Sequence, residues 1–405
     1  MRAPWFAPLI MLGACQQGAV SINLPTTPVG QSDTLVARDL APGVAYRKFV
    51  DRTAPNVMYL VRVDLRRTDL ALRHVRALDQ LVSREKTSDM ARRVTATGAT
   101  VLAAVNGDFF SPTGENENNQ VLGGEWWKGV QVSESTFDTF DNAHAQFGVD
   151  AAGRPLMDRF VLDGRAWARG AVTPVATVNS VPQGAPTAAS LYTWRYGAAT
   201  PRDTVRKVTE APMVAAGKRA DTLLYVRRGT TSPTSVTAIP ANGAVLVAYG
   251  TGSSAQGVQA MADGDTVKIL LATLPRAGSG LVPALLIGGW PQILRDGSNE
   301  AGQSATVEGT IASNTDNQHP RTAVGFSRDS SMLYLLVVDG RTTLSVGVTT
   351  VQLAVLLQRL GAWHAMNFDG GGSTTMVIDG VVVNAPSDAT GERPVGNALL
   401  VVKKP

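Results

Sequence analysis

The sequence of 405 residues has a single cysteine, Cys15, and only four histidines. One cysteine cannot form an intrachain disulfide, so cross-links do not stabilise the fold. The histidines are scattered, and His74, His144 and His364 fall in expected strand or surface positions. A histidine-based zinc site is therefore not expected.

Long apolar runs and clustered charge are also missing. No run of apolar residues reaches the length that a bilayer-spanning helix needs. The net charge is +4, but basic pairs such as Arg66-Arg67 and Arg227-Arg228 are dispersed and do not alternate with aromatic residues. This pattern predicts no nucleic-acid partner, while binding of small anions stays open.

The N-terminal segment resembles the export signal of a bacterial lipoprotein. Arg2 precedes a short apolar run, and "LGAC" (Leu12 to Cys15) resembles a lipobox. We therefore expect a signal peptide at 1–14, lipidation of Cys15, and a flexible tether at 15–38, rich in Pro, Thr, Ser and Gly. The expected location is the bacterial cell envelope, with the lipid on Cys15 holding the protein at the membrane on its periplasmic or cell-surface side. An ordinary N-terminal tail is the alternative.

Apolar periodicity predicts strands through the first part of the chain. Residues 57–65 and 70–78 alternate as half-buried strands do, and 101–105 is continuously apolar. The segment 87–98 predicts a short helix with Thr87 or Ser88 as its N-cap. From about 150 to 283, short apolar runs are broken by Gly and Pro, which predicts a β-rich middle lobe inserted in one domain spanning 39–405.

The C-terminal third has the clearest pattern. Thr349 and Gln352 form a capping-box pattern before a leucine stripe that Gly361 closes, which predicts a helix. "HAMNFD" then predicts a strand, and Asp379-Gly380 predicts a two-residue hairpin turn. The whole pattern predicts an α+β fold with mixed, largely antiparallel sheets and a few packed helices.

The stretch "NFDGGGSTT" places three glycines behind a carboxylate, at residues 367–375. It is not a dinucleotide fingerprint or a P-loop, because the G-x-G-x-x-G spacing and a Gly-Lys-Ser/Thr sequence are both missing. Ser373 also lacks the G-x-S-x-G context of a serine nucleophile. The remaining interpretation is a carboxylate, Asp369, beside exposed NH groups that bind an anion.

Other polar residues that follow apolar strands extend this candidate site. Arg321 offers a bidentate phosphate contact, and Asp108 or Asp339 offers a second carboxylate. The expected substrate- and phosphate-binding residues are Asn106, His319, Arg321, Asn367, Gly370, Gly371, Gly372, Ser373 and Thr374. Asp108, Asp339 and Asp369 are also possible oxygen ligands for a divalent cation, Ca²⁺ or Mg²⁺.

An ordered set of motifs resembles the phosphodiester glycosidase family. These motifs are "AAVNGDFF", "LLIGGWPQILRDG", "HPRTAVGF", "LLVVDGR", "NFDGGGSTTM" and "ERPVGNALLVV". Two positions depart from the family pattern: Asp108 stands where a second glycine is more common, and Trp290 where a third glycine is common.

The resemblance implies hydrolysis of a sugar-1-phosphodiester at the anomeric carbon, which releases a free sugar and a phosphate monoester. Asp369 would be the principal catalytic carboxylate, with Asp108 or Asp339 as its partner, acting as nucleophile, charge stabiliser or activator of water. A glycosidase acting on envelope or extracellular polysaccharide, and a non-catalytic glycan-binding lipoprotein, are the alternatives.

Overall fold

The computed structural model describes residues 32–51, 55–116, 118–130, 144–182, 187–275 and 282–404. It is mostly β, with 48% strand and 13% helix, and it includes a closed barrel of seven strands. The α+β prediction is therefore wrong. Local periodicity found many of the strands, but it carries no information on how the middle segment closes into a barrel.

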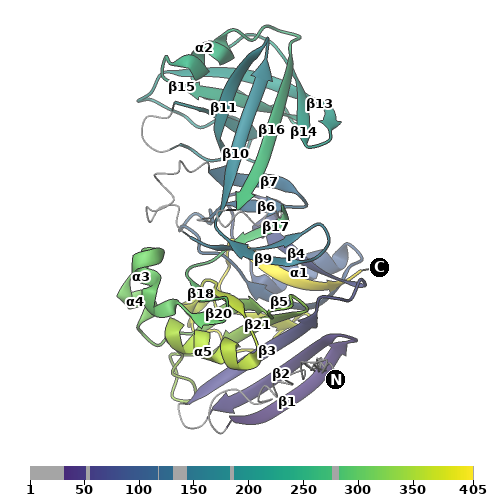
Figure 1. The fold of residues 1–405 in the computed structure, drawn as a ribbon, viewed down its shortest axis with the longest axis vertical. Helices are drawn as coiled ribbons and strands as arrows, with labels where there is room; N and C mark the ends of the chain where they lie inside the picture. The colour runs from purple at the N-terminus through teal and green to yellow at the C-terminus, as the bar shows by residue number, and fades with distance from the viewer. Residues whose placement is uncertain are drawn as a thin grey trace, which may run out of the picture.

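An eight-stranded antiparallel sheet forms one side of the lower body in Figure 1. Its strands, in spatial order, are β1 (Ser32–Ala41), β2 (Val44–Asp51), β3 (Asn56–Asp64), β21 (Met332–Val338), β20 (Arg321–Phe326), β22 (His364–Asn367), β18 (Gln292–Arg295) and β19 (Ser298–Asn299).

A five-stranded sheet packs face to face with it. Its order is β24 (Val381–Val382), β23 (Met376–Ile378), β5 (Thr100–Asn106), β25 (Asn397–Lys403) and β4 (Leu70–Arg76). One buried cluster joins the two sheets, with Leu335 and Val337 from β21 facing Leu399 and Val401 from β25. The lower body is thus a β-sandwich.

Each sheet also buries its outer face under a helix. Helix α5 (Thr350–Leu360) packs Leu353 and Leu357 against Leu336 of β21, and α1 (Thr87–Ala96) packs Met90 against Leu400 of β25. Because both faces are buried, β21 and β25 are apolar at nearly every position. The remaining helices are short: η1 (Ala77–Asp79), α2 (Ser253–Gln259), η4 (Ala301–Gln303), α3 (Ser304–Val307), α4 (Ala312–Thr315) and η5 (Gly371–Ser373).

The barrel stands above the sandwich in Figure 1. Its ring order is β10 (Phe160–Ala168), β16 (Thr266–Pro275), β14 (Thr222–Arg227), β13 (Val208–Arg219), β15 (Gly243–Tyr249), β12 (Ala189–Thr193) and β11 (Ala171–Val178), and the β10–β11 pair closes it. The same sheet continues from β11 toward the sandwich through β7 (Glu125–Val130), β6 (Gln120–Leu122), β17 (Pro283–Gly288), β8 (Gln146–Asp150) and β9 (Pro155–Asp158). The ring lies within the segment for which the sequence predicts a β-rich lobe.

Several local predictions are confirmed. Thr349 and Gln352 form a reciprocal capping box on α5, and Gly361 ends the helix in the left-handed region. Asp379 and Gly380 both have positive φ in a two-residue turn between β23 and β24. The N-cap predicted for α1 is wrong, because Lys86 takes that position without a side-chain bond.

The structure describes only part of the N-terminal segment for which the sequence makes predictions. Residues 1–31, with the expected signal peptide and Cys15, lie outside the described residues. Residues 32–38 of the expected tether belong to β1, which pairs with β2 through main-chain hydrogen bonds. Within the described ranges, no helix has the length and apolar character needed to cross a membrane.

We expect Leu357→Ala to lower the free energy of unfolding by about 2–5 kcal/mol, because it leaves a cavity between α5 and the eight-stranded sheet. Val351→Ala on the same helix, where the side chain is 41% exposed, is the control and should change it by less than about 1 kcal/mol. Urea denaturation measures both. Equal effects would contradict the packing described for α5.

Candidate active site

A pocket of about 200 Å³ collects many of the predicted residues. It lies where β5, β17, β21 and β22 end and β20 begins. The predicted residues in its lining are His319, Arg321, Asn367, Asp369, Gly370, Gly371 and Gly372. Asp369 is the one carboxylate among the described residues of this lining.

The main chain of Asp369 is fixed on both sides by the loop after β5. Its NH donates to the carbonyl of Gly107 at 2.9 Å, and its carbonyl accepts from Nδ2 of Asn106 at 2.7 Å. Oδ1 of Asn106 in turn accepts from the hydroxyl of Thr322 on β20 at 2.7 Å. Asn106 is fully buried and lies behind the pocket, so it positions Asp369 and does not line the pocket.

Each of the three glycines lies beneath a different arginine. A Cβ on Gly370 would lie 3.8 Å from Cδ of Arg321, one on Gly371 would lie 2.9 Å from Nη2 of Arg341, and one on Gly372 would lie 2.1 Å from Nη2 of Arg393. The Cβ of Gly370 would also meet the carbonyl of Pro320 at 2.7 Å. Gly371 has φ of 59°, which favours glycine as well. The absence of side chains lets the guanidinium groups of Arg341 and Arg393, and the aliphatic part of Arg321, lie against one turn of backbone.

The NH groups of this turn are only partly available to a ligand. Those of Gly371, Ser373 and Thr374 donate to main-chain carbonyls, so the expected anion-binding nest is smaller than predicted. The side chains of Ser373 and Thr374 are buried outside the lining, and Oγ of Ser373 accepts from Nη1 of Arg393 at 3.4 Å. Ser373 therefore supports Arg393 from behind, while the hydroxyl of Thr374 is buried without a partner in the described structure.

Arg321 is buried, and the hydrogen bonds of its guanidinium go to main-chain carbonyls. Nε donates to Val348 at 3.0 Å, and Nη2 donates to Asn314 at 2.6 Å and to Asn317 at 3.1 Å. Burial and, to a smaller extent, the positive charge of Arg341 together lower the pKa of Arg321 to about 10. A buried cation without a carboxylate partner favours an anionic ligand.

The sequence did not single out Arg341 and Arg393 as site residues. Arg341 follows β21 in "VVDGR", with φ of 65°, and Nη1 donates to Oγ of Ser387 at 3.3 Å. Arg393 donates to both carboxylate oxygens of Asp388, at 2.7 and 2.9 Å, and this bidentate bond raises its pKa. The sequence motifs could have indicated them, because Arg341 ends "VVDGR" and Arg393 lies in "ERPVGN".

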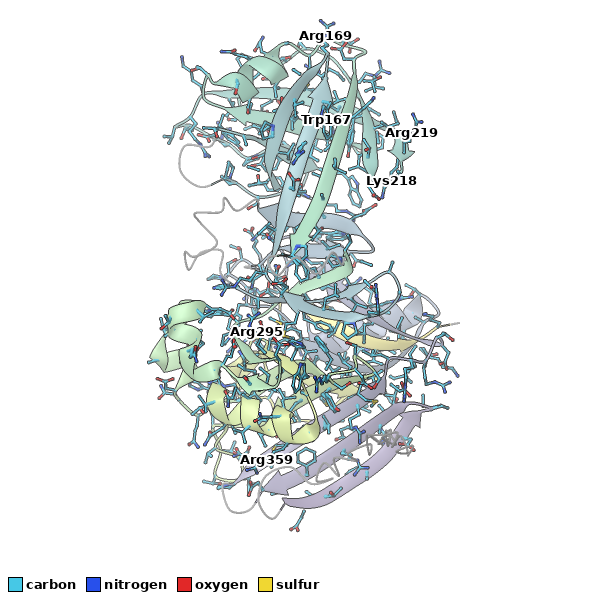
Figure 2. The ribbon with its side chains drawn as sticks, viewed as in Figure 1. Trp167, Arg169, Lys218, Arg219, Arg295 and Arg359 are labelled. Carbon is cyan, nitrogen blue, oxygen red and sulfur yellow. The ribbon has the colours of Figure 1, made fainter. Side chains whose placement is uncertain are left out.

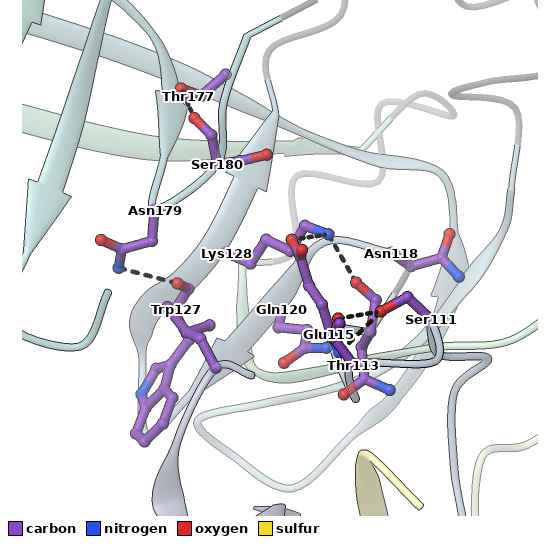
Figure 3. Close-up of polar contacts among 12 residues, drawn as sticks. Ser111, Thr113, Glu115, Asn118, Gln120, Trp127, Lys128, Thr177, Asn179 and Ser180 are labelled. Carbon is purple, nitrogen blue, oxygen red and sulfur yellow. Dashed lines mark hydrogen bonds and ion pairs between the residues drawn. The ribbon is translucent and has the colours of Figure 1, made fainter. Parts of the chain in front are cut away.

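Asp108 is buried and does not line the pocket. Its carboxylate accepts from the main-chain NH of Asn118 at 3.1 Å and from Nδ2 of the same residue at 2.7 Å. Burial lowers the pKa of Arg76 to about 10, and the negative charge of Asp108 opposes this decrease. Figure 3 shows how this loop is tied to β7, where Nζ of Lys128 bonds Glu115 at 3.0 Å and the carbonyl of Asn116 at 2.6 Å.

Asp339 is also buried behind the pocket. It accepts from the hydroxyl of Tyr59 at 3.0 Å, from Nδ2 of Asn384 at 3.2 Å and from the NH of Ala385. Burial raises the pKa of its carboxyl, and these donors oppose the rise. In the described parts of the chain, no three Asp, Glu, His or Cys side chains gather as metal ligands, so Asp108, Asp339 and Asp369 do not form the expected cation site.

Two aromatic side chains also line the pocket. The rings of Trp290 and Phe109 meet edge to face with centroids 6.0 Å apart, and Nε1 of Trp290 donates to the carbonyl of Glu308 at 2.7 Å. Nδ2 of Asn367 donates to the carbonyl of Trp290 at 2.7 Å, while its Oδ1 is buried without a partner in the described structure. The Asn367 oxygen is therefore available to a hydroxyl or NH of a ligand.

Residues 213–402 match a family model described as phosphodiester glycosidase. The predicted resemblance to the phosphodiester glycosidases is confirmed. Among curated proteins, N-acetylglucosamine-1-phosphodiester alpha-N-acetylglucosaminidase of Bos taurus is 37% identical over 111 residues, which cover 25% of this chain and 20% of that protein. The prophage-derived protein YomE of Bacillus subtilis is 33% identical over 96 residues, which cover 24% of this chain and 15% of that protein.

These matches span only about a fifth of the length of the curated relatives, or less. A solved structure of a hypothetical protein from Synechocystis superposes with a TM-score of 0.70 at 18% identity, over 93% of this chain and 64% of that one. At that identity the similarity concerns the fold alone. Both the family description and the name of the bovine relative denote glycosidases, which are hydrolases.

We expect Gly372→Ala to weaken binding of inorganic phosphate to this pocket by about tenfold or more, or about 1.4 kcal/mol. The added Cβ would lie 2.1 Å from both Nη2 of Arg393 and Oδ1 of Asp388, so the pair must move. Gly302→Ala, which meets no atom within 4 Å, is the control. Calorimetric titration measures the affinities, and unchanged phosphate binding by Gly372→Ala would contradict the arrangement.

The carbonyl of Glu308 accepts a hydrogen bond from Trp290, and we expect the titration of its carboxyl group to make stability depend on pH. Its carboxylate accepts from the NH groups of Gln292 and Ala145, and burial raises its pKa from 4.5 to about 7. The folded state then binds the proton more tightly than the unfolded state. The stabilisation is complete below about pH 4.5 and is lost as the pH rises to about 7, by on the order of 3 kcal/mol.

Glu308→Gln cannot titrate, so this component of the pH dependence should disappear. Urea denaturation of both proteins at pH 5 and pH 8 measures it. The wild type should lose more stability between the two pH values than the variant. An equal loss in both proteins would show that Glu308 titrates normally.

Proposed function

We propose that the protein is a hydrolase that cleaves a sugar-1-phosphodiester at the anomeric carbon and releases a free sugar and a phosphate monoester. The observation that carries the proposal is the pairing in one pocket of a single carboxylate, Asp369, with the guanidinium groups of Arg321, Arg341 and Arg393. The family match supports the reaction class.

This charge pattern suits a phosphate leaving group. In the reaction, the oxygen of water bonds to the anomeric carbon, and the bond from that carbon to the phosphate oxygen breaks with its electron pair on phosphate. The proton that water loses passes to the released phosphate monoester or to solvent. A phosphate monoester has a second pKa of about 6, so it departs without the strong protonation that an alcohol requires. Three guanidinium groups stabilise the charge that grows on it. Asp369 faces the developing positive charge of the sugar.

The two aromatic side chains suit the sugar. Trp290 and Phe109 offer ring surface to its C–H face, and Oδ1 of Asn367 accepts from a hydroxyl or amide NH. The phosphate would then lie on the arginine side and the sugar on the tryptophan side, with Asp369 between them. N-acetylglucosamine is the first sugar to test, because the name of the bovine relative specifies it.

The two alternatives fit the pocket less well. Hydrolysis of an ordinary glycoside uses two carboxyl groups near the scissile bond, one of them as an acid. The described lining of this pocket contains one carboxyl group, that of Asp369. Asp108 and Asp339 are buried outside the lining, where they accept hydrogen bonds from Asn118 and Tyr59. A purely glycan-binding role would not require three arginines, one of them buried, beside a carboxylate.

We expect Asp369→Asn to lower kcat/KM on the methyl diester of N-acetylglucosamine-1-phosphate by roughly 1000-fold or more, because the substitution removes the negative charge next to the anomeric carbon. The wild type should release free sugar from this diester and leave methyl N-acetylglucosaminide intact. Released sugar is quantified by chromatography.

Asp379→Asn is the matched control, because Asp379 pairs only with exposed Arg38 on the surface at 2.9 Å, and it should keep wild-type activity. Wild-type turnover by Asp369→Asn would refute the assignment of Asp369. Cleavage of the methyl glycoside at the same rate as the diester would favour the polysaccharide alternative. Binding of the diester without product would favour the non-catalytic one.

We also propose that the protein is lipid-anchored at the bacterial cell envelope, supported by the lipobox-like sequence before Cys15. In bacterial cells given radiolabelled palmitate, the full chain should incorporate the label and its mature form should begin at Cys15. Cys15→Ser should remain unlabelled. Label on Cys15→Ser, or an unlabelled wild type, would refute the anchor.

A further inference from the structure

The β-barrel has an open mouth of about 820 Å³, lined by residues of β7, β13, β14 and β16. On β14, Leu223 and Tyr225 pack with the barrel core, and both line this space. On β16, Leu271 does the same, and Trp126 of β7 closes one side. Barrel mouths of this kind are common ligand sites.

Two polar atoms in this mouth have no protein partner in the described structure. Trp126 is 6% exposed and Tyr225 is 8% exposed, and neither the indole NH nor the phenolic hydroxyl makes a hydrogen bond. Burial and, to a smaller extent, the negative charge of Glu125 raise the pKa of Tyr225 to about 12. The phenol therefore stays protonated and can donate a hydrogen bond. Both atoms are therefore donors offered to the cavity.

The rim presents an exposed aromatic ring held in a fixed position. Arg195 lies between two indoles, with its guanidinium carbon 4.0 Å from the ring centroid of Trp127 and 4.4 Å from that of Trp194. It also pairs with Glu125 at 2.6 Å. Trp194 remains 51% exposed, so one face of its ring is open to a ligand at this rim.

The charges of the rim balance. Glu125 and Asp221 are opposed by Arg195 and Lys218, and Figure 2 shows Lys218 at the edge of the barrel next to Arg219. An anionic polymer such as nucleic acid would gain no net attraction here. The site instead combines ring surfaces with neutral donors and paired charges.

We infer that the barrel mouth binds a neutral saccharide. A pyranose has one C–H face that packs on an indole such as Trp194, and hydroxyl groups that both donate and accept. These hydroxyls can accept from Trp126 and Tyr225 and donate to Glu125. The mouth shares no lining residue with the Asp369 pocket, so this site is independent of the proposed catalytic function.

Calorimetric titration with maltohexaose, cellohexaose and N-acetylchitohexaose tests the inference. The wild-type chain should bind at least one of them with a Kd below about 1 mM. Trp194→Ala and the conservative Tyr225→Phe should each weaken that binding, Trp194→Ala by about tenfold or more. Trp194→Ala should leave turnover of the soluble sugar phosphodiester unchanged, which places the binding outside the catalytic pocket.

Trp167→Ala is the matched control. Trp167 lies on β10 between Ala166 and Ala168, which face the interior, and so its side chain is on the outer barrel wall (Figure 2). This variant should bind the saccharide as the wild type does. Absence of binding to all three oligosaccharides would overturn the inference. Equal binding by the wild type, Trp194→Ala and Tyr225→Phe would also overturn it.

Discussion

The close approach of three arginines to one glycine turn is the constraint on which the rest of the site depends. Like charges repel, and Arg321, Arg341 and Arg393 come from three separate segments that must be held in place. The sandwich supplies that rigidity, because Arg321 begins β20, Arg341 follows β21 and Arg393 precedes β25. Main-chain carbonyl groups accept hydrogen bonds from Arg321, and the carboxylate of Asp388 accepts from Arg393. These contacts offset part of the repulsion between the arginines before any ligand binds.

The buried polar residues around the site form its support. Asn106 joins the Asp369 loop to Thr322 on β20, across the contact between the two sheets. Asp108 fixes the loop that carries Phe109, and Asp339 fixes the segment after β24 through Asn384. A buried polar group that lost one of these partners would leave the other unsatisfied, so the supports are expected to be as sensitive to substitution as the lining.

The sequence predicted the central elements and missed what depends on long-range contact. Helix α5 and the Asp379-Gly380 hairpin follow from local patterns, and the polar loops that hold Asp369 and Arg321 do meet in one pocket. Asp108 and Asp339 have the same local pattern as Asp369, a carboxylate after an apolar strand. Only their partners, Asn118 and Tyr59, distinguish buried support from pocket lining. The pairing of β10 with β11 that closes the barrel likewise cannot be predicted from the local periodicity of the sequence.

The most direct test of the central claim is a crystal structure with a non-hydrolysable phosphonate analogue of a sugar-1-phosphodiester. We expect the phosphonate oxygens within hydrogen-bonding distance of Arg321, Arg341 or Arg393, with the anomeric carbon facing the carboxylate of Asp369 and the sugar ring toward Trp290. A phosphonate bound away from these arginines, or a sugar whose anomeric carbon faces away from Asp369, would contradict it.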